Sequence, residues 1–166
     1  MVLICATDSL TLHHRPSGCS LGVCSRIPPR TYHYLTTPMN WTNAQSYCRE
    51  KYTDLATIES LEDLHELDSS FSYGWSWIGL QDDPKSWKET MGHEPNSWRW
   101  SATGETSRTG FHAWNTGQPD RNGGKEACVL MGAGGKWSNM ECQASHSFVC
   151  YTGKRRFALV DFNRPT

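Results

Sequence analysis

The sequence lacks the features that would indicate binding to nucleic acid, membrane insertion or a thiolate metal site. The net charge is −1 and no large basic patch occurs, which argues against a nucleic-acid partner. No hydrophobic run approaches the roughly 20 residues of a membrane span, so we expect no membrane insertion. The seven cysteines include no C-x-x-C pair, which disfavours zinc-ribbon and thioredoxin-like sites.

Seven cysteines in 166 residues instead indicate disulfides formed in an oxidising, extracellular compartment. Four of them lie where the sequence shows clear periodicity: Cys48, Cys128, Cys142 and Cys150. The other three, Cys5, Cys19 and Cys24, lie in residues 1–29, which show no periodicity. Residues 1–6 are too short for the apolar core of a secretion signal. We interpret residues 1–29 as a disordered flank or a signal remnant, or else the start of a longer chain is missing.

Residues 30–152 show the patterns of one α+β domain. Thr42 and Gln45 form a capping box, so a helix should begin there, with Cys48 on its buried face. Ser60 caps a second helix, and apolar residues follow at helical spacing in this order: Leu61, Leu64, Leu67 and Phe71. The predicted strands are residues 32–36, 75–80, 98–100, 128–131, 136–139 and 147–151, with an extended link at 54–58.

Two segments fall outside this regular pattern. Residues 101–127 contain six glycines or prolines, and a loop of this length is usually functional. In the tail, residues 153–166, positions 155–160 repeat the pattern of residues 30–35. The tail is either the start of a second, truncated copy, as in a tandem or oligomeric protein, or a chance basic and apolar sequence.

Seven short motifs occur in the order and at the spacing of the C-type lectin-like domain family, which the sequence resembles over about residues 30–152. The motifs are WTNAQSYC at 41–48, DLATI at 54–58, WIGL at 77–80, WRW at 98–100, QPD at 118–120, CVL at 128–130 and FVC at 148–150. The resemblance implies a C-type lectin-like fold with two helices, small antiparallel sheets and a long ligand-binding loop. It also implies the bridges Cys48–Cys150 and Cys128–Cys142, because four cysteines alone allow three pairings.

The resemblance further implies a calcium-dependent carbohydrate site on the long loop. Calcium takes about six to eight oxygen ligands and exchanges water for sugar hydroxyls. In the family the first two ligands flank a cis proline, which matches Gln118-Pro119-Asp120, and a third matches Glu126. The Gln-Pro-Asp order resembles that of galactose-type members. The expected carbohydrate-binding residues are Gln118, Asp120, Glu126, Ser138 and Asn139, and all of these except Ser138 are expected calcium ligands.

Three departures from the family pattern favour an alternative. Ser138 and Asn139 follow Trp137 where the family has Asn and Asp, which leaves two acidic ligands and predicts weak calcium binding. No aromatic residue follows the triplet to stack on a sugar, although His112 and Trp114 precede it. In addition, Ala127 stands where an acidic residue is common. The alternative is a lectin-like fold that binds a protein or another surface, without sugar and with little or no calcium.

The remaining motifs carry little weight. No nucleophile, base and orienting group converge, so we expect a binding module and not an enzyme. The expected partner of this module is a carbohydrate or glycoprotein. Glu94-Pro95-Asn96 resembles a mannose-type triplet but precedes the strand at 98–100, so we attribute it to chance. Asn40 heads an N-glycosylation sequon, with an unmodified helix entry as the equal alternative. Cys19 and Cys24 are expected not to pair. Among the tryptophans, Trp87 and Trp114 are the candidates for exposed contacts, whereas Trp77, Trp98, Trp100 and Trp137 should be core.

Overall fold

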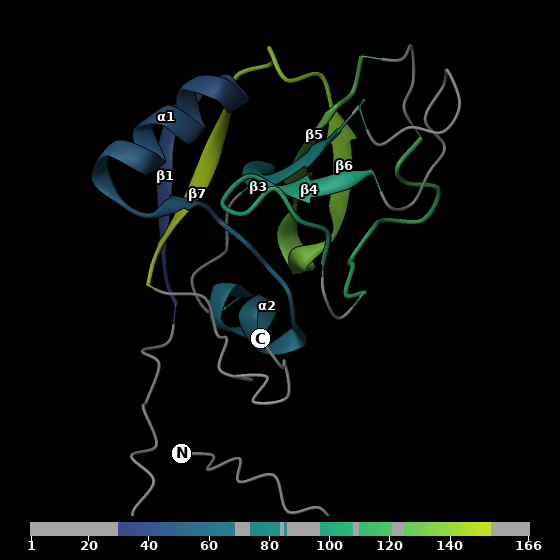
Figure 1. Cartoon of the computed structure of the whole chain (residues 1–166), viewed down its shortest axis with the longest axis horizontal. Coiled ribbons are helices and arrows are strands. Elements are labelled where there is room, and N and C mark those ends of the chain that lie inside the picture. Colours follow the sequence, from purple (N-terminus) through teal and green to yellow (C-terminus); the bar gives the residue numbers. More distant parts are fainter. Residues whose placement is uncertain are drawn as a thin grey trace, which may run out of the picture.

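The computed structural model describes residues 30–68, 74–83, 85, 97–107, 110–120 and 125–153. Within these ranges the chain forms two α-helices and one mixed sheet (Figure 1). The interpretations of residues 1–29, of Phe71, Trp87 and Glu94-Pro95-Asn96, and of the tail beyond Gly153 lie outside the described residues.

Helix α1 (Trp41–Lys51) is capped by Asn40 and not by Thr42. The Asn40 side chain accepts the backbone N–H of Asn43 at 2.9 Å, which satisfies a donor that the first helical turn leaves free. The predicted capping box at Thr42 and Gln45 is therefore wrong, because Thr42 already lies inside the helix. The expected buried face is present, since Trp41, Ala44 and Cys48 are all buried.

Helix α2 (Leu61–Asp68) begins as predicted, because the Ser60 hydroxyl accepts the backbone N–H of Asp63 at 3.1 Å. Its apolar face is narrower than expected. Leu67 is buried and Leu64 is half-buried, whereas Leu61 is 58% exposed. Leu61 therefore does not belong to the buried stripe that the spacing predicted.

The seven strands found in the described ranges form one connected sheet with the order β1-β7-β3-β5-β6, in which β2 pairs with β7 and β4 pairs with β3. The strands are β1 (Thr31–Met39), β2 (Asp54–Leu55), β3 (Ser76–Asp82), β4 (Trp98–Trp100), β5 (Cys128–Met131), β6 (Trp137–Met140) and β7 (His146–Thr152). Strands β1 and β7 are antiparallel, with Thr31 opposite Thr152. Strands β3 and β7 are parallel, so the sheet is mixed and not a set of small antiparallel sheets.

Two apolar cores flank this sheet. One contains Trp77, Phe148 and the Cys48–Cys150 bridge, and it lies under α1. The other contains Trp100, Trp137 and Val149, and the long loop packs on it. The second bridge joins Cys128 to Cys142, so both pairings implied by the family resemblance are confirmed. The four tryptophans predicted to be core, Trp77, Trp98, Trp100 and Trp137, are all buried.

A buried ionic cluster at the start of the domain was not predicted. Arg30 is 4% exposed, and its guanidinium lies 2.9 Å from Glu59 and 3.0 Å from Asp63. The same guanidinium donates to the carbonyl of Thr57 at 2.9 Å. Because Asp63 is on α2 and Arg30 directly precedes β1, this cluster fixes the helix against the first strand.

Candidate functional site

Four of the five predicted site residues meet around Asn139 on strand β6. The backbone N–H of Asn139 donates to Gln118 Oε1 at 3.0 Å, and Asn139 Oδ1 accepts the backbone N–H of Asp120 at 3.1 Å. Asn139 Nδ2 donates to Glu126 Oε2 at 2.9 Å and to the Glu126 carbonyl at 3.3 Å. We call Gln118, Asp120, Glu126 and Asn139 the Asn139 cluster.

The loop reaches this cluster because it runs alongside β6. The Trp137 N–H donates to the Ala113 carbonyl at 2.9 Å, and the Asn115 N–H donates to the Trp137 carbonyl at 2.8 Å. The Gln118 N–H then closes a turn onto the Asn115 carbonyl at 3.0 Å, just before the cis Gln118-Pro119 bond. The Pro119 segment therefore folds back beside Trp137, as the family resemblance implied.

Ser138 lies apart from the other predicted site residues. Its hydroxyl accepts a hydrogen bond from Asn115 Nδ2 at 3.0 Å. Successive side chains of a strand point to opposite faces, so Ser138 leaves β6 on the face opposite to Asn139. The structure thus brings Gln118, Asp120, Glu126 and Asn139 together but not Ser138.

The oxygen atoms of the Asn139 cluster do not fit a calcium ion. Calcium takes about six to eight oxygens, with carboxylates prominent among them. Here Gln118 Oε1 and Asn139 Oδ1 already accept backbone N–H groups, and Asn139 presents a nitrogen donor to Glu126. This amide orientation follows from its partners, since a backbone N–H needs an acceptor and a carboxylate needs a donor. Across the described ranges, no three His, Cys, Asp or Glu side chains are grouped so that they could hold a metal.

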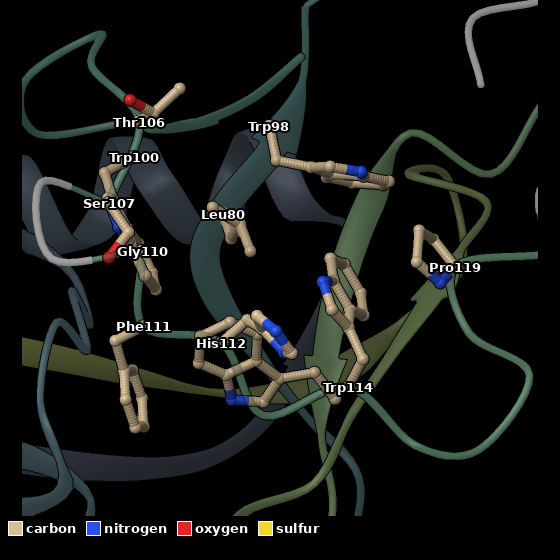
Figure 2. A pocket seen from close by; sticks show the side chains of 11 residues that line it. Leu80, Trp98, Trp100, Thr106, Ser107, Gly110, Phe111, His112, Trp114 and Pro119 are labelled. Carbon is tan, nitrogen blue, oxygen red and sulfur yellow. The ribbon is translucent and has the colours of Figure 1, made fainter. Parts of the chain in front are cut away.

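Pro119 also borders an aromatic pocket of about 290 Å³ (Figure 2). The pocket is lined by Leu80, Trp98, Trp100, Thr106, Ser107, Gly110, Phe111, His112, Trp114, Pro119 and Trp137. Figure 2 shows the Trp114 ring between Trp98, His112 and Pro119. Trp137 and Asn139 lie on the same face of β6, so the pocket and the Asn139 cluster are neighbours on one side of this strand.

Edge-to-face contacts between aromatic rings hold the pocket wall in place. Trp137 contacts Trp100, Phe111 and Trp114 with ring centroids 5.7, 5.9 and 5.7 Å apart. Trp100 and Trp137 are fully buried, whereas Phe111 and Trp114 are half-buried and His112 is exposed. The buried rings therefore form the base of the pocket, and the loop residues form its accessible rim.

This pocket was only partly recognisable from the sequence. His112 and Trp114, the aromatic residues noted before the triplet, line the pocket, whereas Phe111 and Thr106 were not predicted to do so. A signal was present, because Phe111, His112 and Trp114 place three aromatic rings within four positions of an otherwise polar and glycine-rich loop. Trp114, a candidate for exposed contacts, is half-buried at the rim of the pocket.

Comparisons with known proteins agree with this architecture. The Lectin C-type domain family matches residues 37–152. L-selectin of Mus musculus is 31% identical over 129 residues, which are 74% of this chain and 32% of the selectin. The chain thus spans about a third of the length of the curated relatives it matches.

Two solved structures are also similar. The cow C-type carbohydrate-recognition domain of CD23, solved in the presence of a GlcNAc2Man3 oligosaccharide, has a TM-score of 0.61 at 25% identity, over 75% of this chain and 88% of that one. A calcium-independent type II antifreeze protein has a TM-score of 0.60 at 25% identity, over 85% and 98% of the two chains. Neither helix in the described residues has the length and apolar character needed to cross a membrane.

Proposed function

The chain belongs to the C-type lectin domain family, and from this membership we propose that it binds carbohydrate at the aromatic pocket and the polar edge beside Pro119. The domains of this family are binding modules, so the chain is a binding domain and not an enzyme.

The observation that carries the proposal is the aromatic pocket with polar groups at its rim. A sugar ring has an apolar face that can lie on an aromatic ring and hydroxyl groups that need hydrogen-bonding partners. Trp114 and His112 supply rings at the accessible rim, and Thr106 supplies a hydroxyl group. The exposed Asp120 follows Pro119, so it adds a carboxylate at the edge of the same pocket.

We further propose that this binding does not require calcium. Asn139 places an amide N–H against Glu126, where a cation site would need an oxygen ligand. The Gln118-Pro119-Asp120 order resembles that of galactose-type members, so galactose is the first sugar to test and mannose is its comparison.

A second candidate function is the binding of a protein or another surface without sugar. The observation that favours it is that both residues after Trp137, Ser138 and Asn139, already bond other side chains or backbone groups of the domain. Ser138 is bonded to Asn115, and Asn139 is bonded to the residues that would otherwise be calcium ligands. Under this alternative the aromatic rim would contact apolar side chains of the partner.

Three accompanying features are proposals of the same kind. Two disulfides support an extracellular location, because such bridges persist in oxidising compartments. Asn40 remains a predicted glycosylation site, and its cap bond uses Oδ1, which leaves Nδ2 for a glycan. A tandem or oligomeric arrangement also remains a prediction, which would raise avidity for a shallow site.

The experiment that tests the proposed function is a glycan array probed in calcium and again in EDTA. We expect binding to a defined set of glycans that is equal in both buffers. Binding that disappears in EDTA would restore the calcium-dependent reading, and no binding in either buffer would favour the protein-binding alternative.

A further inference from the structure

We propose that the amide group of Asn139 takes the place of a divalent cation in this domain, joining the Pro119 segment and Glu126 to strand β6 by hydrogen bonds alone. The inference concerns how the loop is held, so it does not depend on whether the ligand is a sugar.

The first support is that one residue bonds the other three residues of the Asn139 cluster. Asn139 bonds Gln118 through its backbone N–H, Asp120 through Oδ1 and Glu126 through Nδ2. Asn139 is 3% exposed, so water competes little for these bonds. The bond to Glu126 joins an amide donor to a carboxylate, and such charge-assisted bonds are about twice as strong as neutral ones.

The second support is that every atom of the Asn139 side-chain amide is used in the orientation its partners require. The Asp120 N–H can only donate, so it fixes Oδ1, and Nδ2 must then face Glu126. A metal ligand at position 139 would have to present an oxygen where this nitrogen donor stands. The cluster therefore has its hydrogen bonds only while the residue is an amide.

The third support is a comparison with an aspartate of the same shape. Asn139→Asp would replace the donor to Glu126 by a carboxylate oxygen, at the place where Nδ2 now lies 2.9 Å from Glu126 Oε2. Two carboxylates that close repel each other in a partly buried site unless a cation or proton lies between them. One atom of residue 139 thus decides between a loop held by hydrogen bonds and a loop that needs a cation.

Amide hydrogen exchange, followed by NMR, tests this inference on the full chain. In the wild type we expect the same protection of the Asp120 and Asn139 amides in EDTA and in millimolar calcium. In Asn139→Asp we expect the Asp120 amide to exchange at least about tenfold faster in EDTA, and calcium should reverse this loss.

The matched control is Asn115→Asp, which makes the same chemical change in the loop beside β6. Asn115 Nδ2 bonds Ser138 and not the carboxylates, so this variant should leave the Asp120 amide within about twofold of wild type in both buffers. Should Asn139→Asp not fold, Gln118→Ala removes only the acceptor of the Asn139 N–H. That variant should speed exchange at Asn139 and not at Asp120.

Three results would overturn the inference. The first is protection of the Asp120 or Asn139 amide that falls in EDTA in the wild type. The second is unchanged protection of the Asp120 amide in Asn139→Asp, or of the Asn139 amide in Gln118→Ala. The third is a loss of protection in Asn139→Asp that calcium does not reverse. A chain that binds no glycan but shows the expected exchange pattern would refute the proposed function and leave this inference intact.

Discussion

The indole rings of Trp114 and Trp137 meet edge to face, with centroids 5.7 Å apart and an interplanar angle of 84°. Trp137 is fully buried on β6, so this contact fixes a half-buried loop tryptophan at the rim of the aromatic pocket. The rim is therefore held in place before any ligand arrives, which reduces the entropy lost on binding.

Replacing Trp114 by alanine should weaken glycan binding and leave the fold intact. Loss of a stacking ring typically weakens binding by about 1–2 kcal/mol, which is a roughly five- to thirtyfold loss of affinity. Calorimetric titration with the strongest glycan from the array measures the change. Trp75→Ala is the control, because Trp75 is 44% exposed but does not line the pocket. Equal affinity in the two variants would place the binding site elsewhere.

Arg30→Met should destabilise the domain strongly. The substitution leaves the carboxylates of Glu59 and Asp63 buried without their cation, and breaking a buried ion pair costs about 3–5 kcal/mol. Urea unfolding measures the free energy. The triple variant that also carries Glu59→Gln and Asp63→Asn should recover most of the loss, since no buried charge then remains. If the triple variant is no more stable than Arg30→Met, buried charge is not the cause.

The two disulfides should contribute unequally to stability. Cys48 and Cys150 are separated by 102 positions, and Cys128 and Cys142 by 14. Chain entropy then predicts about 4.7 kcal/mol for the longer loop and about 3 kcal/mol for the shorter. Two double variants test this, each with both cysteines of one bridge replaced by serine, so that neither variant keeps an unpaired thiol from the broken bridge. Equal losses in urea unfolding would contradict the loop-length account.

Gly79→Ala should cost about 2–3 kcal/mol, because a Cβ on β3 has no space. It would lie 2.9 Å from the Leu55 carbonyl and 3.1 Å from the Ala56 carbonyl, both of them backbone atoms that cannot move freely. Gly132→Ala is the control, since the three atoms nearest its Cβ would all belong to the ring of the exposed Trp75, the first at 3.0 Å. Thermal unfolding should show a clearly larger shift for Gly79→Ala than for Gly132→Ala.

Stability should fall as the pH drops below about 6.5, and His146 should contribute to this fall. Burial lowers the pKa of His146, whose ring lies against Trp77 with centroids 5.2 Å apart. The unfolded chain then binds the proton at a higher pH than the native state does, so the contribution of His146 is present above about 6.5 and is lost as the pH falls through its native pKa. Thermal midpoints measured between about pH 8 and pH 5 should vary less in His146→Gln. Parallel curves for the two proteins would assign the acid sensitivity to other groups.

Much of the fold could be predicted from local patterns. Cys48 falls on the buried face of α1 because residues 41, 44 and 48 share one side of a helix, and Ser60 was recognisable as a cap from its hydroxyl and position. The cap of α1 was misassigned because two polar side chains lie within two positions, and either can bond an N–H of the first turn. The parallel pairing of β3 with β7 depends on contacts across 70 residues of sequence, which no local pattern contains.

The grouping of four predicted residues was predictable, but its chemistry, the position of Ser138 and the pocket residues Phe111 and Thr106 were not. The family resemblance brought Gln118, Asp120, Glu126 and Asn139 together, and the structure shows them in contact. The orientation of the Asn139 amide toward Glu126 depends on where the Asp120 N–H points. That direction is set by the folded loop and cannot be seen in the sequence. The buried role of Arg30 was missed for the same reason, since its partners lie 29 and 33 positions away.

The pairing of Thr31 with Thr152 brings the first and last strands of the domain together on the side of the molecule away from the long loop (Figure 1). The polypeptide therefore enters and leaves the domain at neighbouring positions. A protein fused before β1, after β7 or at both ends would therefore leave the face that carries the long loop accessible. The same module could be grafted into a surface turn of an unrelated protein and still present its aromatic rim to the surroundings.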